Sequence, residues 1–217
     1  MVPVKQPAAR PYGGRTNDER VAQRHAALLH AAFALVAEDG WRALRIDALC
    51  RAAALNKRYF YESFDGLEAV VAALTKRLAE DAIAVALGAI EPGVPAREAT
   101  RQAIAAIVGH LTDDPRRARV LFGAVPAADA AAGHRADALR QVITAAAATG
   151  RDLHDLGADP AVALAASMLV GGTSQVLLDW LDGRIACDRD RLVDDLVALW
   201  QVIGDATAAA SRGPRGH

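Results

Sequence analysis

Apolar residues recur at helical spacing along most of this chain, and no segment shows the alternating pattern of a β-strand. The first helix is predicted to run from Thr16 or Asn17 to Gly40, a residue suited to the left-handed conformation that ends helices. The residues of its predicted buried face are Leu28, Leu29, Ala32, Leu35 and Val36.

Two short amphipathic units follow, separated by a tight break. The apolar stripe of the first unit consists of Ile46, Leu49 and Ala53, with Leu55 at the turn. Asn56 is suited to cap the second unit, which begins with Lys57 and Arg58. Phe60 and Phe64 lie four residues apart and are expected to be buried. The charged start of a short helix held across another helix is how a helix-turn-helix presents residues to the DNA major groove.

Caps and breakers divide the remainder into further helices. A cluster of breakers at residues 91–95 ends a long fourth helix, and the stretch 126–133 is predicted to be a loop. Asp-Pro pairs at 114–115 and 159–160 read as an N-cap followed by proline at the first helical position. The later helices are predicted at 66–90, 95–111, 114–122, 134–148, 159–181 and 188–203. The pattern predicts an all-α fold of about nine helices.

Charge is distributed unevenly. Residues 1–66 hold 10 Lys and Arg against 7 Asp and Glu, and the remainder holds 15 against 19. A mildly basic segment on an acidic body suits a protein that binds DNA through a local patch. Cys50 and Cys187 lack metal-ligand spacing and suit a reducing cytoplasm, with Cys50 expected as a core thiol. The apolar run 161–178 is interrupted by polar and glycine residues, so we expect a buried helix and no membrane span.

The pattern from the first helix onward resembles the N-terminal region of TetR-type (tetracycline-repressor-like) transcriptional regulators. The match is close over about sixty residues and loose over the later helices. It rests on Leu28-Leu29, Ala31-Ala32, Glu38-Asp39-Gly40, Ile46, Leu49, Ala53, Leu55, Asn56-Lys57, Tyr61, Phe64 and Glu68. The resemblance implies an N-terminal three-helix DNA-binding domain and a C-terminal helical domain that binds a ligand and dimerises.

Three positions depart from the family pattern. Ala54 stands where glycine is usual in the turn, which predicts mild backbone strain. Arg45 replaces the usual threonine at the start of the second helix, and Leu67 replaces a lysine that is thought to touch phosphate. We expect phosphate contacts to be redistributed, with Arg45 supplying what Leu67 cannot.

Candidate DNA contacts lie around the second unit of the motif. An arm at the N-terminus carries Arg10 and Arg15, which either enter a minor groove or belong to a disordered tail. The DNA-binding candidates are Arg45, Asn56, Lys57, Arg58, Tyr59 and Tyr61.

Candidate ligand and dimer contacts lie on the later helices. The family's cavity lies between its fifth to eighth helices, although ordinary core packing is an open alternative for each candidate. The cavity candidates are His110, Phe122, Met168 and Trp180. The last two helices are expected to form a four-helix interface with a second copy, the alternative being packing within one subunit. The interface candidates are Met168, Gly171, Gly172, Leu192, Leu196 and Trp200.

Two functions remain open from the sequence. The first is a repressor that binds double-stranded DNA at a palindromic operator as a homodimer and is released by a small, largely apolar effector. The second is a helical dimeric module that binds a ligand or partner and has weakened or lost DNA binding. No catalytic constellation, metal site or cofactor motif is found, so we expect no enzyme. The expected organisation is an arm (1–16), a DNA-binding domain (17–80, motif about 43–64), a ligand-binding and dimerisation domain (81–208) and a tail (209–217).

Overall fold

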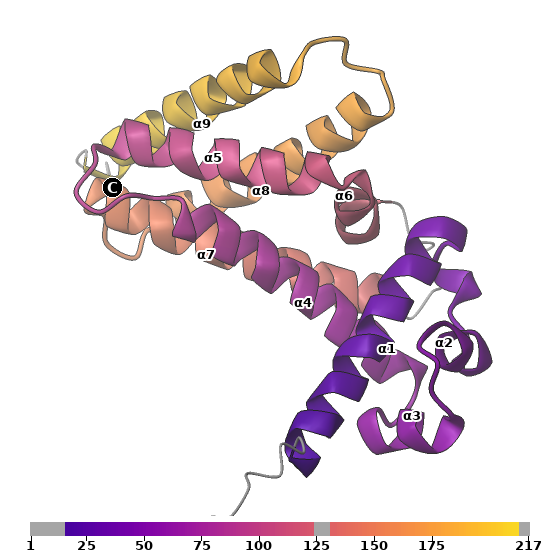
Figure 1. The fold of residues 1–217 in the computed structure, drawn as a ribbon. Coiled ribbons are helices and arrows are strands. Elements are labelled where there is room, and N and C mark those ends of the chain that lie inside the picture. Colours follow the sequence, from indigo (N-terminus) through magenta and orange to yellow (C-terminus); the bar gives the residue numbers. More distant parts are fainter. Residues whose placement is uncertain (1–15, 124–130, 213–217) are drawn as a thin grey trace, which may run out of the picture.

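The computed structural model describes residues 16–123 and 131–212 and is all-α over these ranges, as the apolar spacing predicted (Figure 1). The predicted arm up to Arg15, with Arg10, lies outside the described residues. The α-helices are α1 (Asn17–Asp39), α2 (Ile46–Ala52), α3 (Lys57–Ser63), α4 (Leu67–Gly88), α5 (Ala96–Asp113), α6 (Pro115–Phe122), α7 (Ala131–His154), α8 (Pro160–Leu181) and α9 (Arg189–Arg212). A 3₁₀ turn at Trp41–Ala43 joins α1 to α2.

Helix α1 has the boundaries that its caps dictate. The Thr16 hydroxyl accepts from the Glu19 backbone N–H at 3.2 Å, and the Glu19 carboxylate accepts from the Thr16 N–H at 2.8 Å. This reciprocal capping box satisfies donors that the first turn leaves free. Gly40 ends the helix at φ 77° and ψ 174°, a backbone conformation with positive φ that favours glycine but differs from the predicted left-handed helical one.

The head, formed by α1 to α3, folds around a shared apolar core. Leu28, Leu49 and Phe60 are fully buried there, and Phe64 is nearly so. Between α2 and α3 the chain turns through Ala54 at φ 52°, a left-handed conformation in a residue that carries a Cβ. The strain expected from the missing glycine is therefore present in the backbone.

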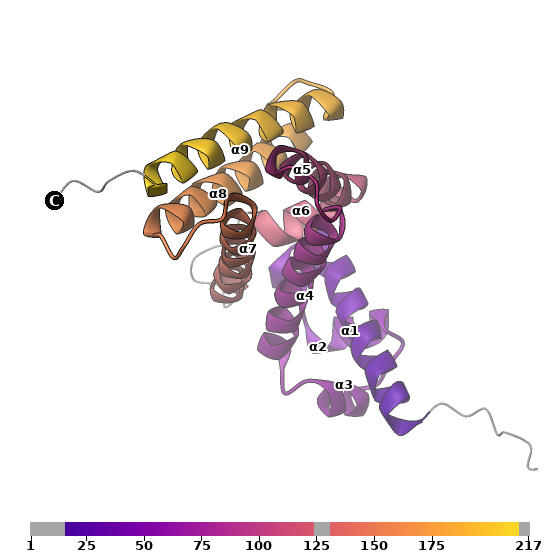
Figure 2. The ribbon, with the colours of Figure 1, turned by 90° about the vertical axis from the view of Figure 1, so that its left-hand side faces the viewer.

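Helix α4 leaves the head and runs along the body, formed by α5 to α9 (Figure 1). Val70, Val71 and Leu74, in its first half, complete the core of the head. Ala79 and Ala82, further along, pack with Leu121 of α6 and Ala138 of α7. Figure 2 shows α4 as the element between α1 and the helices of the body.

Helices α6 and α8 begin as their Asp-Pro pairs predicted. The Asp114 carboxylate accepts from the Arg116 N–H at 3.2 Å, and Pro115 opens α6. The Asp159 carboxylate accepts from the Ala161 N–H at 2.9 Å, and Pro160 opens α8. At each helix start the aspartate oxygen accepts from a backbone N–H of the first turn. The proline has no backbone N–H that would need a partner there.

Two glycines that were expected to end helices lie inside them instead. Helix α7 continues past Gly150 to His154, and α9 continues past Gly204 to Arg212, so the predicted tail from residue 209 is helical up to 212. A Cβ on Gly204 would lie 3.3 Å from His154 Nε2, so glycine lets α9 approach the end of α7 closely. Packing between helices therefore offsets the cost of about 1 kcal/mol for each interior glycine.

Helix α8 is less covered by its own subunit than its composition predicts. Of the described helices it alone is long and apolar enough to cross a membrane, with a mean hydropathy of 1.7 over an 18-residue window, yet only 22% of that window is buried. Leu164 and Met168 are 64% and 62% exposed, so a single subunit leaves one side of this predicted buried helix uncovered. Contiguous exposed apolar surface of this kind is typical of interaction sites.

Replacing Ala54 with glycine should stabilise the protein. Relief of the left-handed strain, about 1–2 kcal/mol, exceeds the added entropy of unfolded glycine, about 0.5–1 kcal/mol, so urea unfolding should give a net gain of roughly 0.5–1 kcal/mol. The matched control is Ala53→Gly, because Ala53 has a right-handed φ of −84° and gains no relief. Equal destabilisation by both variants would show that the turn stores no strain.

Candidate nucleic-acid interface and internal cavity

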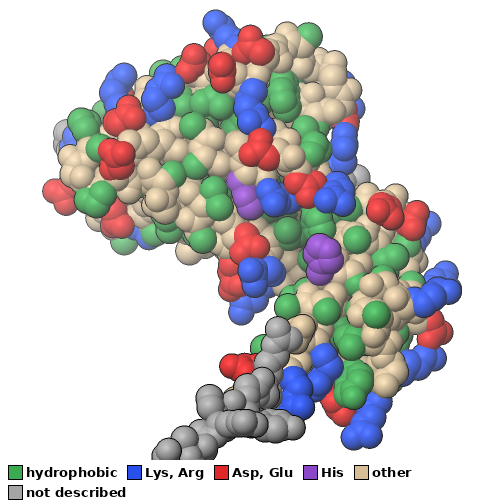
Figure 3. Space-filling model, viewed as in Figure 1, with side chains coloured by type: hydrophobic (Ala, Val, Ile, Leu, Met, Phe, Trp, Pro, Cys, Tyr) green, Lys and Arg blue, Asp and Glu red, His purple; other side chains and the backbone are tan. Residues whose placement is uncertain are grey.

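Helix α3 presents its charged residues to solvent at one end of the molecule. The Asn56 carboxamide accepts from the Tyr59 N–H at 3.0 Å and so starts the helix. The side chains of Arg58 and Lys57 are 83% and 63% exposed, and Tyr61 is also exposed. Figure 3 shows Lys and Arg side chains gathered at the end of the molecule formed by the head. The structure thus brings four of the six DNA-binding candidates together on one short helix, with Asn56 as its cap.

Lys57 is held by a carboxylate of the preceding helix. Its Nζ lies 2.8 Å from Asp47 Oδ1, across the turn between α2 and α3. The hydrogen bond and charge of Lys57 lower the pKa of Asp47, and the same contact raises the pKa of Lys57. Both groups therefore stay charged near neutral pH, and Asp47 competes with any phosphate that approaches Lys57.

Arg58 is also paired. Its Nε donates to Glu62 Oε1 at 3.0 Å, one helical turn away, and the other Glu62 oxygen lies 3.5 Å from Arg24 Nη2 of α1. The Arg24 guanidinium lies 4.7 Å from the centre of the Tyr59 ring. Tyr59 therefore also braces α3 against α1. Glu62 and Arg24 are not among the residues predicted from the sequence, although a carboxylate four residues after Arg58 signals the Arg58–Glu62 pair.

The departures at Arg45 and Leu67 have different surroundings. Arg45 is exposed at the N-cap position of α2 and makes no capping hydrogen bond with its side chain. Leu67 is half-buried at the start of α4 and packs against the core of the head.

Cys50 is buried in that core, and desolvation raises the pKa of its thiol, which fits the expected core role.

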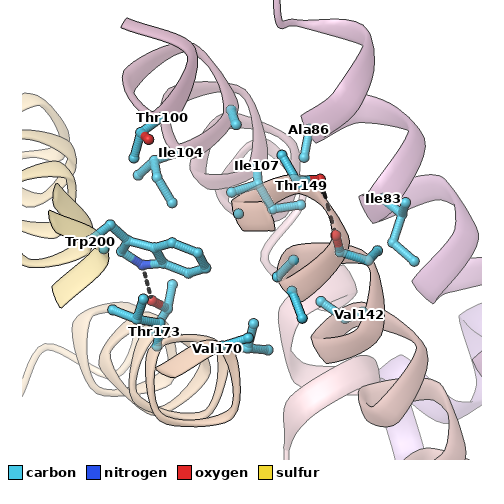
Figure 4. A pocket seen from close by; sticks show the side chains of 18 of the residues that line it. Ile83, Ala86, Thr100, Ile104, Ile107, Val142, Thr149, Val170, Thr173 and Trp200 are labelled. Carbon is cyan, nitrogen blue, oxygen red and sulfur yellow. Dashed lines mark hydrogen bonds between the residues drawn. The ribbon is translucent and has the colours of Figure 1, made fainter. Parts of the chain in front are cut away.

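A cavity of about 190 Å³, partly open to solvent, lies among the helices of the body, and α4 to α9 all contribute to its wall. Figure 4 shows apolar side chains converging on it from several helices. The wall includes Ile83 of α4, Ile104 of α5, Phe122 of α6, Val142 of α7, Val170 of α8 and Trp200 of α9. The Trp200 ring is fixed by a hydrogen bond from its Nε1 to Thr173 Oγ1 at 2.9 Å. The cavity therefore lies where several helices meet, a common setting for small-molecule sites.

Of the cavity candidates from the sequence, the wall includes Phe122 but not His110, Met168 or Trp180. Burial and the charge of Arg117 lower the pKa of His110, whose carbonyl accepts from Arg117 at 2.9 Å. Met168 points to solvent, and Trp180 donates to the Cys187 carbonyl at 2.8 Å. Periodicity placed these residues on the right helices without fixing which side faces the cavity.

The interface candidates separate into two groups. Gly171 and Gly172 are exposed like Met168, on the open side of α8. Leu192 and Leu196 are only 3% and 4% exposed, so they lie in the subunit core with too little surface to offer a partner. Trp200 faces the cavity. Within one subunit, Leu192 and Leu196 therefore face the core and Trp200 faces the cavity, whereas the outward side of α9 carries Leu199 and Val202.

Comparison with known proteins agrees with this architecture. Residues 28–74 match the family model for bacterial regulatory proteins of the tetR family. The sequence matches no curated protein.

Solved structures share the fold at low sequence identity. A protein described as a transcriptional regulator from Pseudomonas aeruginosa PAO1 superposes with a TM-score of 0.70 at 19% identity, covering 91% of this chain and 100% of that one. A TetR-like transcriptional regulator from Rhodococcus sp. RHA1 gives a TM-score of 0.60 at 21% identity, covering 86% and 96%. FadR from Bacillus subtilis, in complex with stearoyl-CoA, gives a TM-score of 0.61 at 17% identity, covering 85% and 98%.

Replacing Asp47 with asparagine should strengthen binding to DNA of any sequence. The change frees Lys57 and removes a charge that repels phosphate, so affinity should rise roughly two- to fivefold, the range spanned by one exposed ion pair. The matched control is Glu80→Gln, which removes a carboxylate 3.7 Å from Lys76 on α4. Fluorescence anisotropy with a random duplex measures both. A rise of equal size in the control would assign the effect to net charge alone.

Proposed function

We propose that this chain, which carries the N-terminal DNA-binding domain of the tetR family of bacterial regulatory proteins, is a dimeric repressor released from its operator by a small apolar effector. The domain match supports a non-enzymatic, DNA-binding transcriptional regulator. The observation that carries the finer proposal is that α4 belongs to the core of the head and to the wall of the cavity.

The DNA contact in this proposal is made by the exposed side of α3. Lys57, Arg58 and Tyr59 enter the major groove, with Arg58 donating to a guanine edge and Tyr61 reaching a phosphate. Arg58 suits base reading because its guanidinium is exposed while Glu62 holds its Nε. Arg45 adds a phosphate contact at the start of α2.

The dimer in this proposal forms through the open sides of α8 and α9. Seven large apolar side chains are exposed among the described residues, and four of them lie on these two helices. Those four are Leu164, Met168, Leu199 and Val202. Gly171 and Gly172 lie on the exposed side of α8 and would allow close approach. A twofold pairing would cover all of these positions and present two α3 helices to a palindromic site.

The switch in this proposal acts through α4. Ile83, Ala86 and Leu87 line the cavity, as does Ile90 just beyond the helix. Helix α6 offers a second route, since Val120 packs with the head, Leu121 with α4, and Phe122 lines the cavity. An effector that shifts α4 would change the separation of the two α3 helices, which must stay near one DNA turn, about 34–36 Å.

A helical ligand-binding module with weakened DNA binding is the second candidate function. It is favoured by the carboxylates beside Lys57 and Arg58 and by the half-buried Leu67, which offers no charge to phosphate. Binding of the purified protein to the DNA upstream of its own gene separates the two candidates. Saturable binding supports the repressor, and binding no tighter than to random DNA supports the module.

Arg58→Ala should reduce the preference of the protein for operator DNA over random DNA. Loss of one bidentate contact to guanine removes about 1–3 kcal/mol of discrimination, so affinity for the operator should fall while affinity for random DNA changes little. Lys57→Ala is the comparison variant and should weaken both, with a smaller salt dependence. An unchanged ratio of operator to random affinity in Arg58→Ala would exclude a base-reading role.

Leu199→Asp should separate the subunits. An unpaired charge in an apolar interface costs several kcal/mol, so sedimentation should show a dimer for the unaltered protein and a folded monomer for the variant. Ala136→Asp places the same charge on an exposed position of α7 and should remain dimeric. A monomeric unaltered protein at micromolar concentration would refute the dimer.

Effector and operator should weaken each other's binding by the same factor. This reciprocity follows from linkage, and allosteric factors are typically about 5–150-fold. Titrating a molecule that fills the cavity, with and without operator, measures the factor by calorimetry. Equal effector affinities in both titrations would mean that the cavity and the head are uncoupled.

A further inference from the structure

The cavity wall carries almost no charge. Among the described residues, the wall includes no Lys, Arg, Asp or Glu, and His154 is the single ionisable side chain that these residues contribute. An ionised carboxylate moved into such surroundings loses its hydration without a compensating partner. The wall therefore disfavours an anionic ligand.

The hydroxyl groups of the wall offer few protons to a ligand. Thr100, Thr149, Ser174 and Thr207 each donate to the carbonyl four residues earlier in their own helices, at 2.9, 3.0, 2.7 and 2.7 Å. Their oxygens remain available only as acceptors. Thr173 differs, because its oxygen accepts from Trp200 and its proton is left to point elsewhere. A ligand thus meets one free neutral hydroxyl donor, fixed beside an aromatic ring.

The cavity is partly open to solvent, so its volume indicates how much of a ligand the wall can cover. An apolar cavity of about 150 Å³ holds one benzene molecule, and this cavity measures about 190 Å³. The space therefore suits a molecule slightly larger than a single ring, with roughly ten non-hydrogen atoms. A stearoyl chain would extend beyond the part that the wall covers.

A cationic side chain lies near the end of the cavity wall that His154 forms. Arg212 of α9 donates from Nη2 to the His154 carbonyl at 2.9 Å and is exposed. A carboxylate at the edge of the cavity would meet this guanidinium rather than the wall. The side chain of Arg212 is not part of the wall itself.

We infer that the cavity selects a small uncharged molecule of roughly ten non-hydrogen atoms, apolar apart from one hydrogen-bond acceptor directed at Thr173, and that it discriminates against carboxylates and acyl-CoA thioesters. This inference rests on the proposed function for its biological meaning, but the binding event does not require DNA. Its failure is therefore distinguishable from failure of the repressor proposal.

The test compares methyl heptanoate with octanoate, which have the same carbon and oxygen atoms and differ in charge. Calorimetric titration of the full chain without DNA, at about pH 8 where the carboxylate is ionised, should show the ester binding at least tenfold tighter. 1-Naphthol is a second neutral probe and should also bind, whereas stearoyl-CoA should not. Octanoate binding as tightly as the ester, stearoyl-CoA binding, or absence of binding by both neutral probes would each overturn the inference.

Substitutions in the cavity wall and on the outer surface of α7 test where the ester binds. Ala146→Phe fills the cavity and should abolish binding of the ester while the variant stays folded by circular dichroism. Ala136→Phe makes the same change on the exposed side of α7 and should bind normally. Thr173→Val should lower the affinity for the ester. The decrease should be more than tenfold larger than the decrease in affinity for a pure hydrocarbon probe. Octanoate binding that disappears in Arg212→Ala would place a carboxylate at the edge of the cavity and contradict the selection of uncharged ligands.

Discussion

Helix α4 is buried in two separate apolar clusters, and the arrangement of the rest of the molecule depends on that double burial. Val70 and Leu74 pack into the head, while Ala79 and Ala82 pack against α6 and α7. A continuous helix transmits a displacement at one end to the other because its backbone hydrogen bonds resist bending. The small alanines let α6 and α7 lie close to α4, so the cavity wall and the head share one rigid element.

The surface of the head balances attraction to DNA against internal ion pairs. Lys57 and Arg58 each face a carboxylate, and Glu62 also joins α3 to α1 through Arg24. Exposed pairs of this kind contribute little to stability. Their consequence is that phosphate must compete with Asp47 and Glu62, which orders the side chains and moderates affinity. In the proposed function, an uncharged cavity wall and a charged head therefore lie at the two ends of α4 and would bind opposite kinds of molecules.

Much of the fold was predictable because its signals are local. The capping box at Thr16, the cap at Asn56 and the Asp-Pro starts of α6 and α8 each satisfy backbone groups within three or four residues. The left-handed turn at Ala54 was implied by the family resemblance, because glycine is usual at this position of the motif. Lys57, Arg58 and Tyr61 were identified as exposed because Phe60 and Phe64 had to face inward.

The sequence by itself determined which segments are helical, where most of them begin, and which side of the amphipathic head helices is buried. Only the tertiary structure decided which sides of α8 and α9 are buried within the subunit. Periodicity identified Leu192, Leu196 and Trp200 as one apolar stripe of α9, but it could not decide whether this stripe faces the core of its own subunit or a second copy. Gly150 and Gly204 read as helix ends, yet contacts between α7, α8 and α9 keep both inside helices. Long-range packing, which no local pattern encodes, fixed the cavity wall and the open apolar surface.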